Sequence, residues 1–154
     1  MGIPPDGGRC RVIEHTADLG LRATGRTIEA AFAALADGLG RLTAEVERGT
    51  PATATSLSVT GRDLPELAFA WLNELIGQAD ERRAAIAGVE ISPIHGPADE
   101  GEAGSHGWHL AARVRLVRFG FGARPRTAVK SATYHGLEVR PTPAGWVIVA
   151  YLDV

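Results

Sequence analysis

The sequence predicts an α+β fold, a single domain in which two helices pack on a largely antiparallel β-sheet. Two stretches repeat apolar residues at helical spacing, and several others alternate apolar with polar residues as strands do. The predicted order is β-β-α-β-α followed mainly by strands, so helices and strands do not alternate as in a parallel sheet. With 154 residues, 45% of them hydrophobic and 22% charged, the chain can bury one core and is too apolar for general disorder.

The first third of the chain is predicted to hold two strands and a helix. Residues 1–10, rich in Gly and Pro, are expected to form a flexible tail before a domain over residues 11–154. Short strands are predicted over residues 11–14 and 18–24. Thr27 can cap a helix over residues 27–44, because its hydroxyl can accept a first-turn amide. The apolar positions of this helix are Ile28, Ala31, Phe32, Leu35, Leu39 and Leu42.

A second strand-helix unit follows. Residues 53–60 alternate apolar with Ser and Thr, which predicts a strand. Asp63 followed three residues later by Glu66, with a proline between them, is typical of a helix start. The predicted helix over residues 64–80 has an apolar stripe formed by Leu64, Leu67, Ala68, Trp71, Leu72, Leu75 and Ile76.

The rest of the chain reads mainly as strands. A weak strand is predicted over residues 85–91, a loop over residues 92–107, and a strong alternating strand over residues 108–118. Residues 137–140 read as extended. The nearly continuous apolar run over residues 146–152 predicts a central strand buried on both faces.

The charge is unevenly distributed. Residues 111–140 contain seven basic residues and one acidic residue, whereas the whole chain has a formal charge of −2. Such a stretch could meet phosphate groups or an acidic partner. Alternatively, it could be a solvated strand face balanced by acidic residues folded nearby. Lys130 is the only lysine in the chain, so its position could favour an ammonium over a guanidinium, although a lone lysine also occurs by chance.

Several classes of protein are excluded or disfavoured. The single cysteine, Cys10, rules out an internal disulfide and a multi-cysteine zinc site. No apolar run approaches the roughly 20 residues of a membrane span. The first residues have neither a basic flank nor an apolar stretch, so we expect no signal peptide and a cytoplasmic location. His106 and His109 have zinc-like spacing, but they lack a nearby third ligand.

Two places carry acidic groups that could do chemistry. His15 and Asp18 are three apart at the entrance to a strand, where they could form an acid/base pair, hold a metal, or cap a turn. At the other end, Asp153 and the α-carboxylate of Val154 lie within one residue of each other. Held on a rigid strand, they would repel each other unless a divalent cation bound them, with Asp18 as a possible third ligand. The alternative is that both carboxylates sit in water.

Four motifs in the same order resemble the archease family. They are Glu14–Leu21 with the following segment 25–32, the helix segment 67–75, the segment Val129–His135, and the apolar last strand ending in Asp153 and Val154. The resemblance covers about residues 11–154, nearly the whole chain.

The resemblance implies a small protein that assists the RtcB-type tRNA-splicing RNA ligase. Family members promote guanylylation of the ligase by GTP and its multiple turnover, and are not themselves enzymes, so tRNA or other RNA is met indirectly. The implied metal ligands are Asp18, Asp153 and Val154. The expected cation is Ca²⁺, with Mg²⁺ or Mn²⁺ as alternatives. Lys130 matches a functional position of the family, and His15 and His135 are further candidates for partner contact.

One loop departs from the family pattern. Family members usually carry Gly-Glu in the loop after the long strand, whereas residues 119–124 contain no acid. Two rival functions remain. One is an RNA-binding or chaperone-like module that uses residues 111–140, where two phenylalanines lie between arginines. The other is a metal-dependent hydrolase built on His15 and Asp18.

Overall fold

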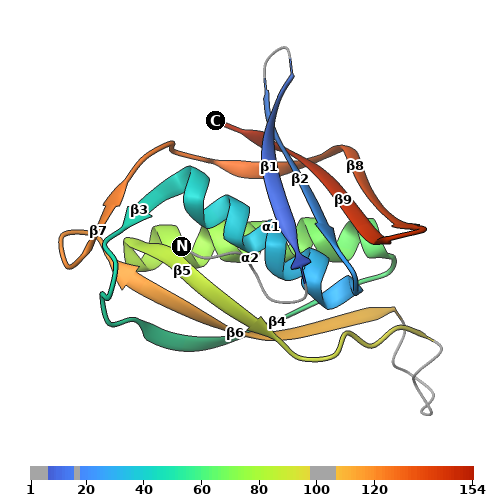
Figure 1. Cartoon of the computed structure of the whole chain (residues 1–154), viewed down its shortest axis with the longest axis horizontal. Helices are drawn as coiled ribbons and strands as arrows, with labels where there is room; N and C mark the ends of the chain where they lie inside the picture. The colour runs from blue at the N-terminus through green and yellow to red at the C-terminus, as the bar shows by residue number, and fades with distance from the viewer. Residues whose placement is uncertain (1–6, 16–17, 98–106) are drawn as a thin grey trace.

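The molecule is a three-layer arrangement in which two helices lie between two antiparallel sheets (Figure 1). The computed structural model describes residues 7–15, 18–97 and 107–154, with only the backbone of residues 14 and 15. The helices are α1 (Ile28–Thr43) and α2 (Leu64–Arg82). Each helix contacts strands of both sheets, α1 chiefly β2 and β5 and α2 chiefly β8 and β4. The predicted α+β class with two helices and antiparallel strands is confirmed.

The strands divide among two main sheets and one ribbon. The four-stranded sheet has the order β1-β2-β9-β8, the three-stranded sheet β4-β6-β5, and β3 pairs with β7 in a two-stranded ribbon. All of these pairs are antiparallel. The strand bounds are β1 (Arg9–His15), β2 (Asp18–Gly25), β3 (Ala44–Val46), β4 (Thr53–Gly61), β5 (Ala84–Ile91), β6 (Trp108–Arg118), β7 (Ala123–Pro125), β8 (Ser131–Thr142) and β9 (Gly145–Asp153).

Both helices begin where the sequence predicts. The Thr27 hydroxyl accepts a hydrogen bond from the Ala30 amide at 3.0 Å, and the Asp63 carboxylate accepts one from the Glu66 amide at 2.8 Å. The Glu66 carboxylate accepts a hydrogen bond from Arg62 at 2.9 Å. α2 ends two residues later than predicted, at Arg82, because Arg83 takes the left-handed conformation with φ 49°.

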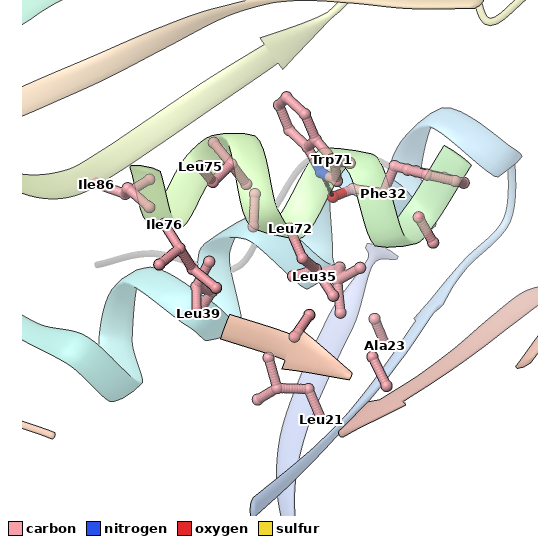
Figure 2. Packing of buried hydrophobic residues seen from close by; sticks show 14 of the residues in the cluster. Leu21, Ala23, Phe32, Leu35, Leu39, Trp71, Leu72, Leu75, Ile76 and Ile86 are labelled. Carbon is pink, nitrogen blue, oxygen red and sulfur yellow. Dashed lines mark hydrogen bonds between the residues drawn. The ribbon is translucent and has the colours of Figure 1, made fainter. Parts of the chain in front are cut away.

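The core lies between the layers and contains both predicted helical stripes (Figure 2). Leu35 and Leu39 of α1 and Leu72 and Leu75 of α2 are almost completely buried. The indole of Trp71 donates a hydrogen bond to the carbonyl of Phe32 at 3.1 Å, which ties α2 to α1 inside the core. β9 is an inner strand between β2 and β8, as its apolar run predicts, but it is not buried on both faces, because Val149 and Tyr151 are partly exposed on the face away from the helices.

The structure corrects two strand boundaries. The expected tail over residues 1–10 ends earlier, because Arg9 and Cys10 already pair with Thr24 and Ala23 in β1; residues 1–6 lie outside the described residues. β8 begins at Ser131 rather than near residue 137. A bulge between Thr133 and Glu138 interrupts its pairing with β9, so the segment has no clear alternation.

The predicted helix over residues 27–44 ends one residue early, and residues 44–46 form β3, a strand that the sequence did not indicate. Within the expected loop over residues 92–107, Ile94 is buried and His95 bridges His109 through the backbone. Neither described helix has the length and apolar character needed to cross a membrane.

Candidate metal centre at the ends of β2 and β9

The beginning of β2 and the end of β9 lie side by side (Figure 1). Leu19 pairs with Leu152, and one residue further along Asp18 opens β2 while Asp153 closes β9. Directly opposite residues of antiparallel strands point to the same face of the sheet. Because the neighbouring Leu152 faces the core with no exposed surface, both carboxylates leave the sheet on the face away from the helices.

β8 brings Lys130 to the same corner. The amide of Lys130 donates a hydrogen bond to the carbonyl of Asp153 at 2.8 Å, and Ser131 then pairs with Asp153. The side chain of Lys130 is exposed, that of Asp18 is partly buried, and that of Asp153 is exposed. Residues from three adjacent strands therefore meet at one end of the sheet, which we call the acidic corner: Asp18, Asp153, Val154 and Lys130.

The two histidines named as partner candidates lie on either side. The backbone of His15 pairs with Asp18 in the β1–β2 hairpin, while its side chain lies outside the described residues. His135 is exposed in the β8 bulge, where its carbonyl accepts a 3.5 Å hydrogen bond from the Thr133 hydroxyl. Next to it, the exposed ring of Tyr134 meets Phe69 of α2 edge to face at 5.5 Å.

A residue that sequence reasoning did not select holds the start of β8. The side-chain oxygen of Asn73 in α2 accepts a hydrogen bond from the Ala132 amide at 2.9 Å, and its NH₂ group donates to the carbonyl of Phe69 at 3.2 Å. The sequence feature that could have identified Asn73 is its polar amide next to the apolar stripe of the helix. Asn73 thereby positions the strand that carries Lys130.

The donor chemistry of the corner fits a hard divalent cation. Carboxylate oxygens are the ligands that Ca²⁺ and Mg²⁺ prefer. The corner supplies two aspartates from facing strands, and the α-carboxylate of Val154 is one residue from Asp153. Within the described residues no group of three or more His, Cys, Asp or Glu side chains is placed to hold a metal.

Comparisons with known proteins identify the family of this chain. The sequence model of the Archease protein family (MTH1598/TM1083) matches residues 11–154. This chain belongs to the archease family. It is 31% identical to Protein archease of Pyrobaculum calidifontis over 144 residues, covering 92% of each chain. It is 30% identical to Protein archease of Thermococcus kodakarensis over 133 residues, covering 86% of this chain and 88% of the relative.

The fold is shared with a solved structure. The solution structure of Methanobacterium thermoautotrophicum protein 1598 superposes with a TM-score of 0.73, covering 97% of this chain and 99% of that one at 22% identity. The similarity supports two helices with mostly antiparallel strands as the architecture of this archease family member.

Three of the seven basic residues in the basic stretch of this archease family member lie near acids in the described part of the chain. Arg115 lies 3.5 Å from Glu90, Arg140 3.8 Å from Glu138, and Arg124 2.6 Å from Glu45. The hydrogen bond and positive charge of Arg124 lower the pKa of Glu45. The basic residues also belong to both main sheets and the ribbon, so the described part of the chain does not gather them on one surface.

The loop that departs from the family pattern presents an aromatic ring. Phe121 is 67% exposed, and the guanidinium of Arg118 lies 4.9 Å from its ring centroid. Gly120 and Gly122, both with positive φ, shape the turn around it. The surface next to β7 therefore presents an aromatic ring beside an arginine.

Proposed function

We propose that this chain is an accessory protein of an RtcB-type RNA ligase, acting in the cytoplasm in tRNA splicing or RNA repair. It promotes guanylylation of the ligase by GTP and the return of the ligase to further rounds of reaction. No bond-making step is assigned to the chain itself, and its contact with RNA is through the RNA ligase. Membership of the archease family supports this assignment.

The acidic corner is the part of the molecule that carries the proposal. The pairing of Leu19 with Leu152 is the observation that supports it, because it aligns Asp18 with Asp153 on one face. We propose that these two carboxylates and the α-carboxylate of Val154 hold a divalent cation, with Ca²⁺ first and Mg²⁺ or Mn²⁺ as alternatives. A bound cation would relieve the repulsion between carboxylates held on neighbouring strands.

Lys130 adds an exposed positive side chain to the corner. Its backbone is tied to Asp153 while its side chain is exposed, so the ammonium can extend toward a partner. In the proposal this charge faces the nucleotide or metal site of the ligase. His15 and His135, which flank the corner along β1 and β8, are proposed to contribute to partner contact.

Stimulation of the ligase tests the proposal. Asp18→Ala is expected to abolish the stimulation of ligase guanylylation by GTP, because it removes a carboxylate on which the cation site depends. The matched control is Glu90→Ala, which removes an exposed acid on the other main sheet. Circular dichroism and thermal unfolding check that both variants fold. Unchanged stimulation by Asp18→Ala would refute the role of the corner.

Direct RNA binding is the second candidate, and the exposed pair of Phe121 and Arg118 favours it. A salt-dependent shift of tRNA by the purified chain alone, weakened by Phe121→Ala, would support this function. A chain that leaves tRNA unshifted at low salt would rule it out.

A further inference from the structure

A cleft of about 350 Å³ opens between β1, the second half of α1 and the connection from β7 to β8. It lies along β1, and nothing in the proposed function uses it. Its principal lining residues are Arg11, Val12, Leu21, Arg41, Leu42 and Arg126. β1 packs tightly on α1 at one side of the cleft, because a Cβ on Gly38 of α1 would meet the sulfur of Cys10.

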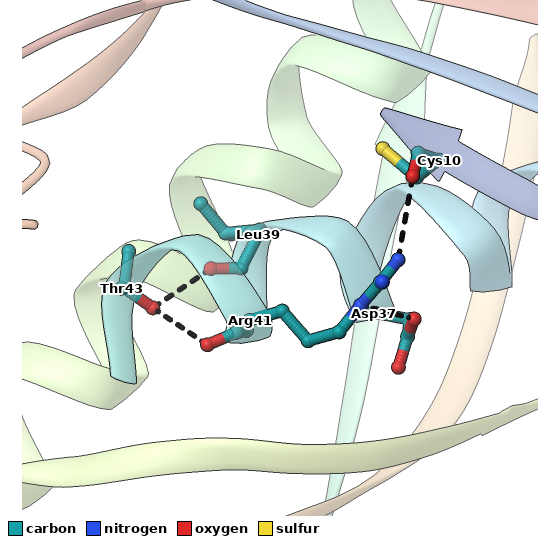
Figure 3. Close-up of polar contacts among 6 residues, drawn as sticks. Cys10, Asp37, Leu39, Arg41 and Thr43 are labelled. Carbon is teal, nitrogen blue, oxygen red and sulfur yellow. Dashed lines mark hydrogen bonds and ion pairs between the residues drawn. The ribbon is translucent and has the colours of Figure 1, made fainter. Parts of the chain in front are cut away.

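Three arginines line the cleft, Arg11 from β1, Arg41 from α1 and Arg126 from the connection between β7 and β8. Arg41 lies 2.9 Å from Asp37 and donates a hydrogen bond to the carbonyl of Cys10 at 3.3 Å (Figure 3). Arg11 and Arg126 are exposed, and within the described part of the chain neither guanidinium lies within 4.0 Å of a carboxylate oxygen. The cleft therefore has two cationic groups available for an acidic ligand.

The floor of the cleft is apolar. Leu21 has no exposed surface and Leu42 packs against the core, whereas Val12 is 47% exposed at the rim. The lining residues include no aromatic ring. Single-stranded nucleic acid is usually held by aromatic rings that stack on its bases, so the cleft lacks what an RNA strand would need.

The wall formed by β1 is an open strand edge. β1 is the last strand of its sheet, so within the described residues its outer edge pairs with no other strand. The carbonyl of Cys10 is bound by Arg41 of α1, which indicates that it points away from β2. Because these directions alternate along an antiparallel strand, the N–H and C=O of Val12 also point outward. They are main-chain groups that another strand can pair with.

We propose that this cleft binds an extended acidic segment of a partner protein, which adds as a strand to the outer edge of β1. The backbone of the segment pairs with the N–H and C=O of Val12. One apolar side chain of the segment rests on Leu42, and carboxylates elsewhere on the segment meet Arg11 and Arg126. Charge complementarity and an unpaired strand edge select this occupant over an uncharged peptide or a nucleic acid.

A designed peptide tests the charge requirement on the full chain. The probe is acetyl-(Glu-Val)₃-amide, observed by NMR at low ionic strength, where exposed charges are least screened. We expect amide shifts confined to β1 and residues 126–127. The double variant Arg11→Glu with Arg126→Glu should weaken binding by about tenfold or more. Arg113→Glu, on the other main sheet, is the matched control and should leave it unchanged.

Strand pairing is tested separately. The same peptide methylated on every backbone amide keeps its charges but cannot donate to a strand edge, so it should not bind. Val12→Pro removes the outward amide without removing a hydrogen bond to β2. It should weaken binding of the unmethylated peptide to the same extent as the double arginine variant. Equal binding of the methylated peptide would overturn strand addition. Shifts at the cleft caused by an oligouridylate but not by the peptide would overturn the peptide assignment.

Discussion

The amide of Lys130 donates a 2.8 Å hydrogen bond to the carbonyl of Asp153, two residues before Ala132 donates to Asn73 of α2. These two bonds connect the end of β9, the start of β8 and the middle of a buried helix. The acidic corner is thus supported from the core side as well as along the sheet. The geometry of Lys130 depends on a residue that does not itself reach the corner.

Asn73→Leu should destabilise the protein and reduce ligase stimulation. The substitution leaves the part-buried Ala132 amide without its acceptor, which costs about 1–3 kcal/mol of unfolding free energy. Freed from α2, the start of β8 should hold Lys130 less firmly. Urea unfolding measures the first effect and a guanylylation assay the second.

The matched control for this prediction is Asn73→Asp, which keeps an oxygen acceptor for the Ala132 amide. We expect it to retain more of both stability and stimulation than Asn73→Leu. Equal losses in the two variants would show that the acceptor oxygen is not what matters at this position.

Trp71→Phe should lower the unfolding free energy by about 2–3 kcal/mol, because it removes the indole hydrogen bond to Phe32 and leaves a cavity. Trp71 has no exposed surface, so the neighbouring side chains cannot fill the space easily. Urea unfolding at constant pH measures the change. A loss below about 0.5 kcal/mol, the range of ordinary surface substitutions, would contradict the packing described here.

Stability should fall in alkali partly because of Cys10. Burial raises the pKa of the Cys10 thiol from 9.0 to about 12, despite the nearby positive charge of Arg41. Below pH 9 the thiol is neutral in both states, so its contribution is fully present; between pH 9 and about 12 only the unfolded state ionises, and stability is lost. The variant Cys10→Ala should lose less stability than the natural chain over this interval. Parallel pH profiles of unfolding free energy would contradict the prediction.

Extending the chain by one glycine after Val154 should impair cation binding without affecting the fold. The extension moves the terminal charge away from Asp153, whereas β9 already ends at that residue. Calcium titration of the extended and natural chains provides the comparison. Identical affinities would exclude the α-carboxylate as a ligand.

Local signals made much of the fold predictable. Thr27 and Asp63 each bind the amide expected of a cap, because capping depends only on residues within one turn. The central position of β9 followed from its apolar run over residues 146–152. Short-range patterns thus located both helices and the strand that ends the corner.

The spacing of residues in the sequence does not show which distant segments contact each other. The division of the strands into two main sheets depends on pairings between distant segments, such as β4 with β6. The β8 bulge hides the strand between residues 131 and 136, and Asn73 acts through a contact with Ala132, 59 residues away. Alignment of Asp18 with Asp153 was expected from the family resemblance, and the antiparallel register of β2 and β9 supplies its physical basis.

Calcium titration of the natural chain and of Asp18→Asn by calorimetry tests the central claim most directly. The account predicts one Ca²⁺ per natural chain and binding weaker by about tenfold or more in the variant, because one carboxylate ligand loses its charge. Glu90→Gln, on the other main sheet, should bind like the natural chain. Equal calcium affinity of the natural chain and Asp18→Asn, or no binding of Ca²⁺, Mg²⁺ or Mn²⁺ to the natural chain, would contradict the account.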